Sequence, residues 1–234
     1  ITMAEIETQD VTARLLQAAL PHVAFDGWSD TTFLAACEDA GVVPELARLS
    51  CPRGAFDLAV RFHHDGDDAM RNALTKTDVT SMKIREKIIY VVRLRIEMID
   101  RKEAVRRAAT LMALPQNAGE GAKLIWRTCD QMWTALEDNS EDVNWYTKRL
   151  TLSSVYASTV LYWLGDTSPN HEATWAFLDR RIANVMEVEK FKARVNTNPL
   201  AKQLLLGPHW LLSKIKAPRQ TLSVNLPGGW PSRQ

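Results

Sequence analysis

Apolar residues recur every three or four positions along almost the whole chain, and the strict alternation typical of strands is nearly absent. Between residues 174 and 186, for example, Trp175, Leu178, Ile182 and Val185 keep this helical spacing. Glycine and proline separate such runs, so the pattern predicts an all-α protein of about nine to ten helices, followed by a C-terminal amphipathic helix. The predicted helices span about residues 9–24, 30–40, 44–50, 52–64, 67–76, 78–99, 102–113, 118–136, 144–164, 170–191 and 199–216.

Three residues mark helix boundaries in the N-terminal quarter. Ser29 is placed to cap the helix at 30–40, and Gly41 is placed to end it. Pro52 is expected to open the next long helix, because proline is tolerated in a first turn. We therefore expect one helical domain over residues 1–191, with a helix-turn-helix-like part at 10–65 and a helical bundle at 66–191. Residues 192–234 form a separate tail.

The short helices near the N-terminus have the rhythm of TetR-type regulators, but not the charge of a DNA reader. A recognition helix needs basic side chains that neutralise phosphates. Here the corresponding segment, VVPELARLSC, offers only Arg48, which is offset by Glu45. The preceding helix carries acidic residues. We interpret this part as a TetR-like scaffold that does not bind nucleic acid, and a ligand-responsive transcriptional regulator remains the alternative function.

The net charge of +1 hides an uneven distribution. The chain has 29 Lys and Arg and 28 Asp and Glu, but residues 190–234 contain 8 basic residues and no acidic one. The remaining 189 residues therefore carry a net charge of −7. An acidic body with a basic tail suggests that the tail has its own partner.

The tail contains a cationic amphipathic stretch at residues 199–216. Such a helix, carrying a tryptophan, is typical of segments that lie in an anionic membrane interface. Docking of the helix onto the acidic body stays open as the alternative. The candidate membrane- or lipid-contacting residues are Leu200, Leu204, Leu205, Trp210, Leu211, Leu212 and Ile215, with Lys202, Lys214 and Lys216.

Residues with catalytic potential are scattered. No metalloprotease, nucleophile-elbow, P-loop or dinucleotide-binding pattern is present. His63 and His64 precede Asp65, but adjacent residues on a helix point about 100° apart, so the segment is interpreted as a helix end with solvated polar groups. The three cysteines are expected to be buried and structural. We therefore predict no cofactor, no metal and no enzymatic activity.

Two segments have two interpretations each. In DVNWYTKR (142–149), Asp142, Trp145 and Arg149 fall within about 60° on a helix, which suits either an interaction hot spot or a helix cap with core aromatics. The small residues at 153–158 leave room for a ligand between helices or permit close helix packing.

DVNWYTKR, together with TCDQMW (128–133), TWAFLDRRIANVM (174–186) and PHVAFDGWS (21–29), resembles the COQ9 family of ubiquinone (coenzyme Q) biosynthesis proteins over about residues 10–190. The resemblance implies a TetR-like fold, commonly dimeric, that binds isoprenoid lipids or phospholipid and presents substrate to the di-iron demethoxyubiquinone hydroxylase. It implies a partner-binding patch of Met132, Asp142, Trp145, Tyr146 and Arg149.

Two further expectations follow from this resemblance. The sequence has no mitochondrial presequence, which suggests a bacterial protein on the inner face of the membrane, or a mature form on the matrix side of the mitochondrial inner membrane. Replacing Trp145 or Arg149 by alanine is expected to weaken partner association and to change the thermal midpoint little.

Overall fold

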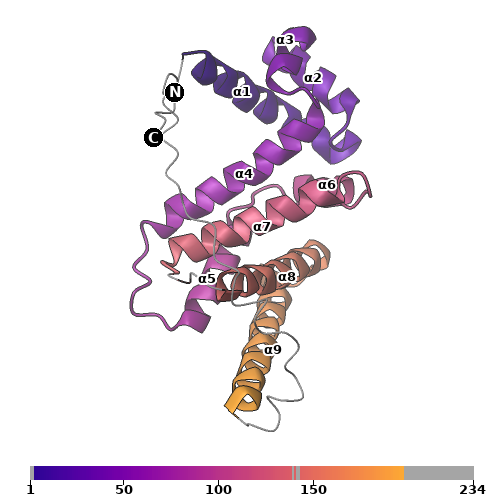
Figure 1. Ribbon diagram of the computed structural model, residues 1–234. Coiled ribbons are helices and arrows are strands. Elements are labelled where there is room, and N and C mark those ends of the chain that lie inside the picture. The colour runs from indigo at the N-terminus through magenta and orange to yellow at the C-terminus, as the bar shows by residue number, and fades with distance from the viewer. Residues whose placement is uncertain (1–2, 139, 141–142, 198–234) are drawn as a thin grey trace, which may run out of the picture.

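The computed structural model describes residues 3–138, 140 and 143–197, and within these ranges every regular element is helical. The all-α prediction is confirmed (Figure 1). The predicted helix at 199–216 lies outside the described residues. The α-helices are α1 (Met3–Asp26), α2 (Asp30–Ala40), α3 (Pro44–Ser50), α4 (Ala55–Leu74), α5 (Ile84–Glu97), α6 (Lys102–Met112), α7 (Ala118–Ala135), α8 (Val143–Gly165) and α9 (Glu172–Thr197), with a 3₁₀ turn η1 (Pro169–His171) before α9.

The predicted boundaries of α2 are confirmed in atomic detail. The Ser29 hydroxyl accepts a hydrogen bond from the Thr32 backbone N–H at 3.3 Å, which satisfies one of the free donors of the first turn. At the other end, Gly41 adopts a left-handed conformation with φ of 63°, where a side chain would be strained. The Ser29 cap and the Gly41 turn each depend on residues that are close in sequence, and for this reason both could be predicted from the sequence.

Two predicted helices, 52–64 and 67–76, are wrong as separate elements, because α4 runs unbroken from Ala55 to Leu74. Pro52 lies in the preceding turn, and Gly54, with φ of 60°, stands at the start of the helix. Gly66 does not end α4. Its lack of a side chain instead leaves room for the side chain of Arg95. A Cβ at this position would lie 2.7 Å from Nη1 of Arg95. The predicted helix at 78–99 also begins later, at Ile84.

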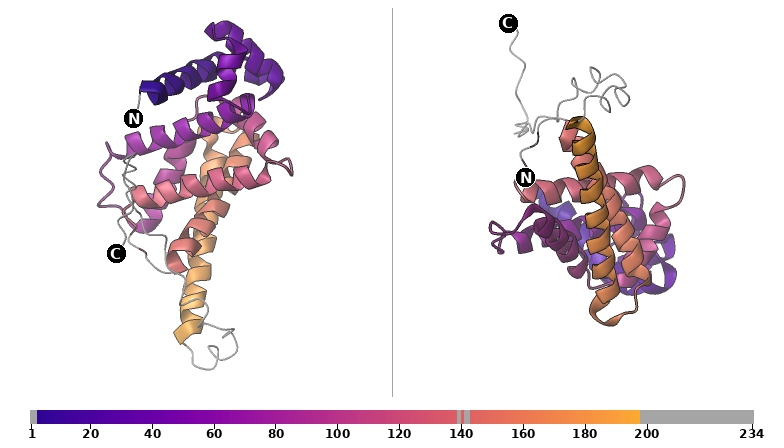
Figure 2. Two further views of the ribbon diagram at one scale, coloured as in Figure 1. Left: turned by 45° about the horizontal axis from the view of Figure 1, so that its top comes forward. Right: turned by 90° about the horizontal axis from the view of Figure 1, so that it is seen from below.

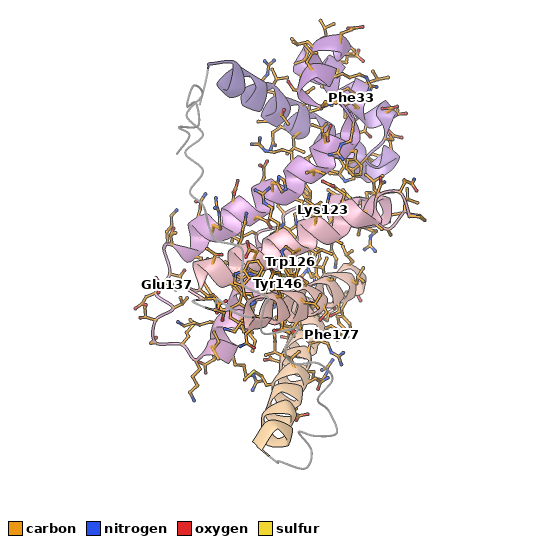
Figure 3. All side chains as sticks on the ribbon, viewed as in Figure 1. Phe33, Lys123, Trp126, Glu137, Tyr146 and Phe177 are labelled. Carbon is orange, nitrogen blue, oxygen red and sulfur yellow. The ribbon has the colours of Figure 1, made fainter. Side chains whose placement is uncertain are left out.

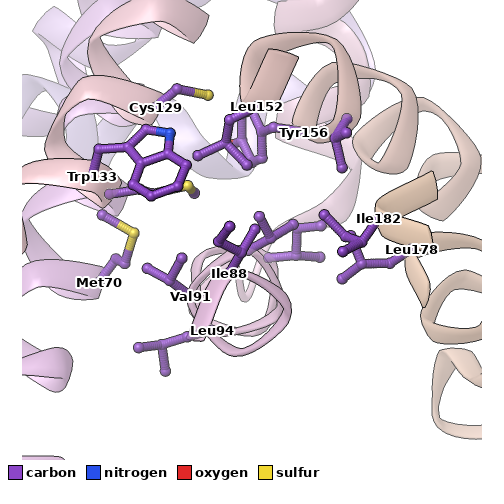
Figure 4. Close-up of a cluster of buried hydrophobic side chains, with 14 of the residues drawn as sticks. Met70, Ile88, Val91, Leu94, Cys129, Trp133, Leu152, Tyr156, Leu178 and Ile182 are labelled. Carbon is purple, nitrogen blue, oxygen red and sulfur yellow. The ribbon is translucent and has the colours of Figure 1, made fainter. Parts of the chain in front are cut away.

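The helices form two apolar cores that share α4. Figures 1 and 2 show the arrangement of these helices. Helices α1 and α2 pack against the first half of α4, and α3 packs against α1 and α2; Leu15, Phe33 and Leu58 are fully buried in this core. The second half of α4 packs with α5 and α7, while α8 lies between α7 and α9. Met70 and Trp133 belong to this second core (Figure 4). The division expected at residues 65/66 therefore falls inside one continuous helix.

Among the described residues, no helix combines the length and the apolar character that crossing a bilayer requires. The three cysteines, Cys37, Cys51 and Cys129, are buried and unpaired, in agreement with the structural role predicted for them.

Candidate functional site

A cavity of about 590 Å³ lies between the two cores, within the size range of small-molecule sites. Helices α1, α4, α6, α7 and α8 and the end of α5 line it. Small residues line it on four helices, among them Gly66 of α4, Ala109 of α6, Gly121 of α7 and Ala157 of α8. Most of its wall is aliphatic or aromatic, and the large apolar side chains there are Leu16, Leu20, Phe62, Met98, Ile99, Val105, Met112, Leu124, Ile125, Val160 and Leu161.

The small residues of α8 divide between the two interpretations drawn from the sequence. Ala157 lines the cavity, as the ligand interpretation expects. The hydroxyls of Ser153 and Ser158 instead hydrogen-bond to carbonyls of their own helix, at 2.8 Å from Arg149 O and 2.8 Å from Ser154 O. Only the alanine therefore contributes open space.

One wall of the cavity is polar and is built on a buried ion pair. Nε of Arg95 donates to Oδ1 of Asp67 at 2.7 Å, and both side chains are almost fully buried. Nη2 of Arg95 also donates to the His63 carbonyl at 3.0 Å. On α7, the Thr128 hydroxyl lies 2.9 Å from Oδ1 of Asp67. A buried charge pair persists when further hydrogen bonds satisfy its remaining polar atoms, and these contacts do so.

His63 joins this wall as a neutral imidazole. Its Nε2 lies 2.8 Å from Oγ1 of Thr128. Because the Thr128 hydrogen points to the carboxylate of Asp67, the Thr128 oxygen accepts from Nε2–H, which leaves Nδ1 of His63 as an acceptor. Burial, reinforced by the positive charge of Arg95, lowers the pKa of His63 to about 4.

The interpretation of residues 63–68 as a solvated helix end is wrong. The segment is the middle of α4, and His64 points to a different partner, Arg127, at 3.1 Å. Two signals existed in the sequence: Asp67 follows His63 by one helical turn, and Arg95 interrupts an apolar run in α5. Neither signal identified Thr128 of α7 as a hydrogen-bond partner of Asp67, because the two residues are 61 positions apart in the sequence.

Tyr156 of α8 completes the polar wall, and sequence analysis missed it. The side chain is only 4% exposed and lines the cavity. Within the described part of the chain, its hydroxyl makes no hydrogen bond. Burial raises its pKa to about 12, so the phenol stays protonated and can donate. A buried polar group without a protein partner is uncommon and needs an explanation.

A second feature, the aromatic patch, consists of Trp126 on α7 with Trp145 and Tyr146 on α8. Figure 3 labels Trp126 and Tyr146. Ring centroids lie 6.0 Å apart for Trp126 and Trp145, and 4.8 Å apart for Trp145 and Tyr146, the latter edge to face. All three side chains are half-buried. The patch therefore presents aromatic surface while resting on the bundle.

Arg149 supports the aromatic patch from beneath. Its guanidinium carbon lies 4.0 Å from the Trp145 ring centroid. Its Nε donates to Asp130 at 2.5 Å and its Nη1 to Asp138 at 3.1 Å, and the residue is 1% exposed. Hydrogen bonds from Lys148, Ser140 and Arg149 overcome the effect of burial and lower the pKa of Asp138.

The predicted partner-binding residues that the structure describes therefore do not form a single exposed surface. Trp145 and Tyr146 reach the surface, Met132 and Arg149 are buried, and Asp142 lies outside the described residues. The ion pairs of the buried Arg149 argue against the expectation that Arg149→Ala changes the thermal midpoint little. The predicted membrane-contacting residues between 200 and 216 also lie outside the described residues.

The weak basicity of the helix-turn-helix-like part is visible in the structure. Arg48, the one basic side chain of α3, lies 3.4 Å from Asp30 of α2. The interpretation that this part does not bind nucleic acid stays a prediction.

The COQ9 family model matches residues 118–189. The chain is 34% identical over 206 residues to "Ubiquinone biosynthesis protein COQ9-B, mitochondrial" of Xenopus laevis, covering 83% of this chain and 69% of that protein. It is 30% identical over 184 residues to "Ubiquinone biosynthesis protein COQ9, mitochondrial" of Drosophila melanogaster, covering 76% of this chain and 56% of the fly protein. The human protein of the same name is 27% identical, with 83% and 64% covered. The chain thus spans little more than half of the fly relative and about two thirds of the other two.

A solved TetR transcriptional regulator from Nitrosomonas europaea superposes with a TM-score of 0.60, covering 74% of this chain and 95% of the regulator. The two sequences are 16% identical, so this likeness shows the fold alone. The predicted TetR-like helical fold is confirmed.

Proposed function

Because the chain belongs to the COQ9 family of ubiquinone biosynthesis proteins, we propose that it is a non-catalytic accessory protein of that pathway. In this proposal it holds an isoprenoid quinone intermediate in its cavity, at a membrane surface, and presents it to the di-iron demethoxyubiquinone hydroxylase. The curated relatives are named as mitochondrial proteins, which favours a mitochondrial site of action. Within the mitochondrion, the proposed site is the matrix side of the inner membrane.

The observation that carries the proposal is the cavity of about 590 Å³ with its largely apolar wall. Moving one CH₂ group from such a wall into water costs about 0.8 kcal/mol, so a five-carbon isoprene unit costs roughly 4 kcal/mol. A protein that shields part of a polyprenyl tail therefore lowers the cost of lifting the ring out of a bilayer by roughly this amount for each isoprene unit that it buries. No reacting group is required of the carrier.

The test is whether a lipid co-purifies with the full chain. Native mass spectrometry, followed by extraction and chromatography, is expected to show an isoprenoid lipid in the wild-type protein. Ala157→Phe fills the cavity wall and is expected to abolish the co-purified species. Ser154→Phe is the matched control, because Ser154 lies on the same helix but is exposed. A wild-type protein that is consistently empty and takes up no added quinone would refute the proposal.

The aromatic patch is the proposed docking surface for the hydroxylase. Half-buried tryptophan and tyrosine side chains are the residue types most often found at interaction hot spots. Trp145→Ala is expected to weaken association with the purified hydroxylase at least tenfold in a pull-down or by surface plasmon resonance. Leu150→Ala is the control, because Leu150 is exposed on the same helix and belongs to neither the patch nor the cavity. Equal effects of the two substitutions would refute this assignment.

The basic tail is the proposed membrane anchor. Truncation after residue 198 is expected to abolish co-sedimentation with vesicles that contain anionic phospholipid. Salt should weaken binding of the full chain, since screening reduces headgroup attraction. Undiminished sedimentation of the truncated protein would refute the assignment. The homodimer expected from the family resemblance is tested by sedimentation velocity on the same two proteins.

A further inference from the structure

A protein that binds only an aliphatic chain does not need the polar wall of this cavity. We propose that His63, Arg95 and Tyr156 form a head-group subsite that selects an uncharged, oxygen-substituted ring, as in a quinone, hydroquinone or phenol, over a phosphate head. The inference rests on the proposed lipid-binding function, and it adds the chemistry by which the cavity distinguishes one class of lipid from another.

Tyr156 supplies the observation that points to a ligand. Its side chain is 96% buried, lines the cavity and leaves its hydroxyl without a hydrogen bond in the described part of the chain. An aliphatic ligand would leave this phenol unsatisfied, whereas a carbonyl, hydroxyl or methoxy oxygen would accept its hydrogen. A site that buries a polar group discriminates strongly in favour of ligands that satisfy it.

His63 supplies the complementary acceptor. Its Nε2–H is held by Thr128 at 2.8 Å, which leaves the Nδ1 lone pair available. The imidazole lines the same cavity as Tyr156. A ring hydroxyl would therefore meet an acceptor at His63 and a donor at Tyr156, and a quinone carbonyl would meet the donor alone.

The charge of the subsite argues against phosphate. The cavity-lining side chains carry two positive charges, Arg95 and Arg101, and two negative charges, Asp65 and Asp100. Asp67 adds a further negative charge directly behind Arg95, at 2.7 Å. The guanidinium is thus already paired with a buried carboxylate, so it offers an anionic head little net attraction.

Gly66 shows that the position of the guanidinium is specified by the fold. Any side chain at this residue would have its Cβ within 2.8 Å of three guanidinium atoms of Arg95. The backbone of α4 therefore lies directly against the planar face of the guanidinium. The close approach leaves the guanidinium facing Asp67, with which it pairs at 2.7 Å.

The experiment measures the binding of two probes to the delipidated full chain by isothermal titration calorimetry. The probes are ubiquinone-2, which has an uncharged ring, and geranylgeranyl diphosphate, which has an anionic head. Only binding that Ala157→Phe abolishes is counted, so that contacts with the basic tail are excluded. The wild-type protein is expected to bind ubiquinone-2 at least tenfold more tightly than the diphosphate.

Two pairs of variants assign the selectivity to the subsite. Tyr156→Phe is expected to weaken ubiquinone-2 binding about fivefold, the value of one hydrogen bond, and to leave diphosphate binding unchanged. Thr159→Val is its control, because Thr159 is a buried hydroxyl one turn along α8 that bonds to Val155 O and does not line the cavity. His63→Leu should weaken binding of the hydroquinone form, and His64→Leu should not.

Three outcomes would overturn the inference. Diphosphate binding as tight as quinone binding would show that the wall does not exclude phosphate. An unchanged quinone affinity in Tyr156→Phe, together with an unchanged hydroquinone affinity in His63→Leu, would show that the ring lies elsewhere. In either case lipid binding, and with it the proposed function, stands. If neither probe binds the cavity, the proposed function fails together with the subsite.

Discussion

Replacing Arg149 by alanine tests whether the region beneath the aromatic patch is a folding element or only a binding surface. Arg149 is 1% exposed and bonds to two carboxylates, Asp130 and Asp138, while its guanidinium lies under the Trp145 ring. The substitution removes all of these contacts at once. The protein should therefore become less stable, whatever happens to partner binding.

The expected loss of stability depends on the solvent exposure and the hydrogen bonds that each carboxylate retains after the substitution. Asp130 is 37% exposed and can rehydrate, whereas Asp138 is 5% exposed and retains Lys148 at 2.6 Å. Removing one partner of a buried ion pair costs about 3–5 kcal/mol, and these remaining contacts place the loss near about 3 kcal/mol. For a chain of this size, each kcal/mol lowers the thermal midpoint by roughly 2–4 °C, so the expected decrease is roughly 6–12 °C.

The assay is thermal unfolding followed by circular dichroism, with Arg93→Ala as the matched control. Arg93 makes the same kinds of contact at the surface: a pair with Glu97 at 2.7 Å and a position 4.7 Å from the Trp175 ring centroid. Exposed pairs contribute at most about 1 kcal/mol, so its midpoint should change by no more than about 4 °C. Equal midpoints for the two variants would refute the reasoning.

A double-mutant cycle isolates the cause. Adding Asp138→Asn to Arg149→Met removes the carboxylate that the single variant leaves without its buried partner. The double variant should therefore recover about 1 kcal/mol or more relative to Arg149→Met. Strict additivity of the two substitutions would show that the charge pair is not what stabilises this region.

Three further substitutions test other parts of the structure. Gly66→Ala should destabilise the protein by about 2 kcal/mol in urea unfolding, because displacing Arg95 outweighs the roughly 1 kcal/mol gain in helix propensity; a stabilised variant would contradict the close packing. Because the pKa of His63 is about 4 in the fold and about 6.5 when unfolded, the unfolded state binds more protons between these values, and stability should rise from pH 4 to 6.5 by at most about 3 kcal/mol. His63→Gln should flatten that rise in urea midpoints, and an unchanged slope would assign it to other groups. Ser29→Ala should cost about 1 kcal/mol through loss of the α2 cap, measured in the same assay, and no loss would mean that the cap is redundant.

The element pattern of this protein is determined by local sequence. The 3.6-residue period, the cap at Ser29 and the left-handed Gly41 each depend on neighbours within one turn, so the positions of α2 and α3 agree with those predicted. Trp145 and Tyr146 could also be identified as candidate partner-binding residues from their residue type alone. The predicted break between residues 64 and 67 was wrong. Gly66 suggested a helix end, whereas in the fold it gives space to the side chain of Arg95, which is distant in the sequence.

The polar wall and the support beneath the aromatic patch were decided by tertiary structure. Arg95 and Arg149 look in the sequence like surface arginines, because periodicity identifies the face on which a residue lies and not what packs against it. Each is buried because other segments supply carboxylates, Asp67 from α4 for Arg95, and Asp130 from α7 and Asp138 from the following turn for Arg149. Desolvating a charge is unfavourable unless such a partner is present. The sequence by itself therefore determined a helical fold of the TetR type, and only the packing of its helices decided which polar residues face the cavity.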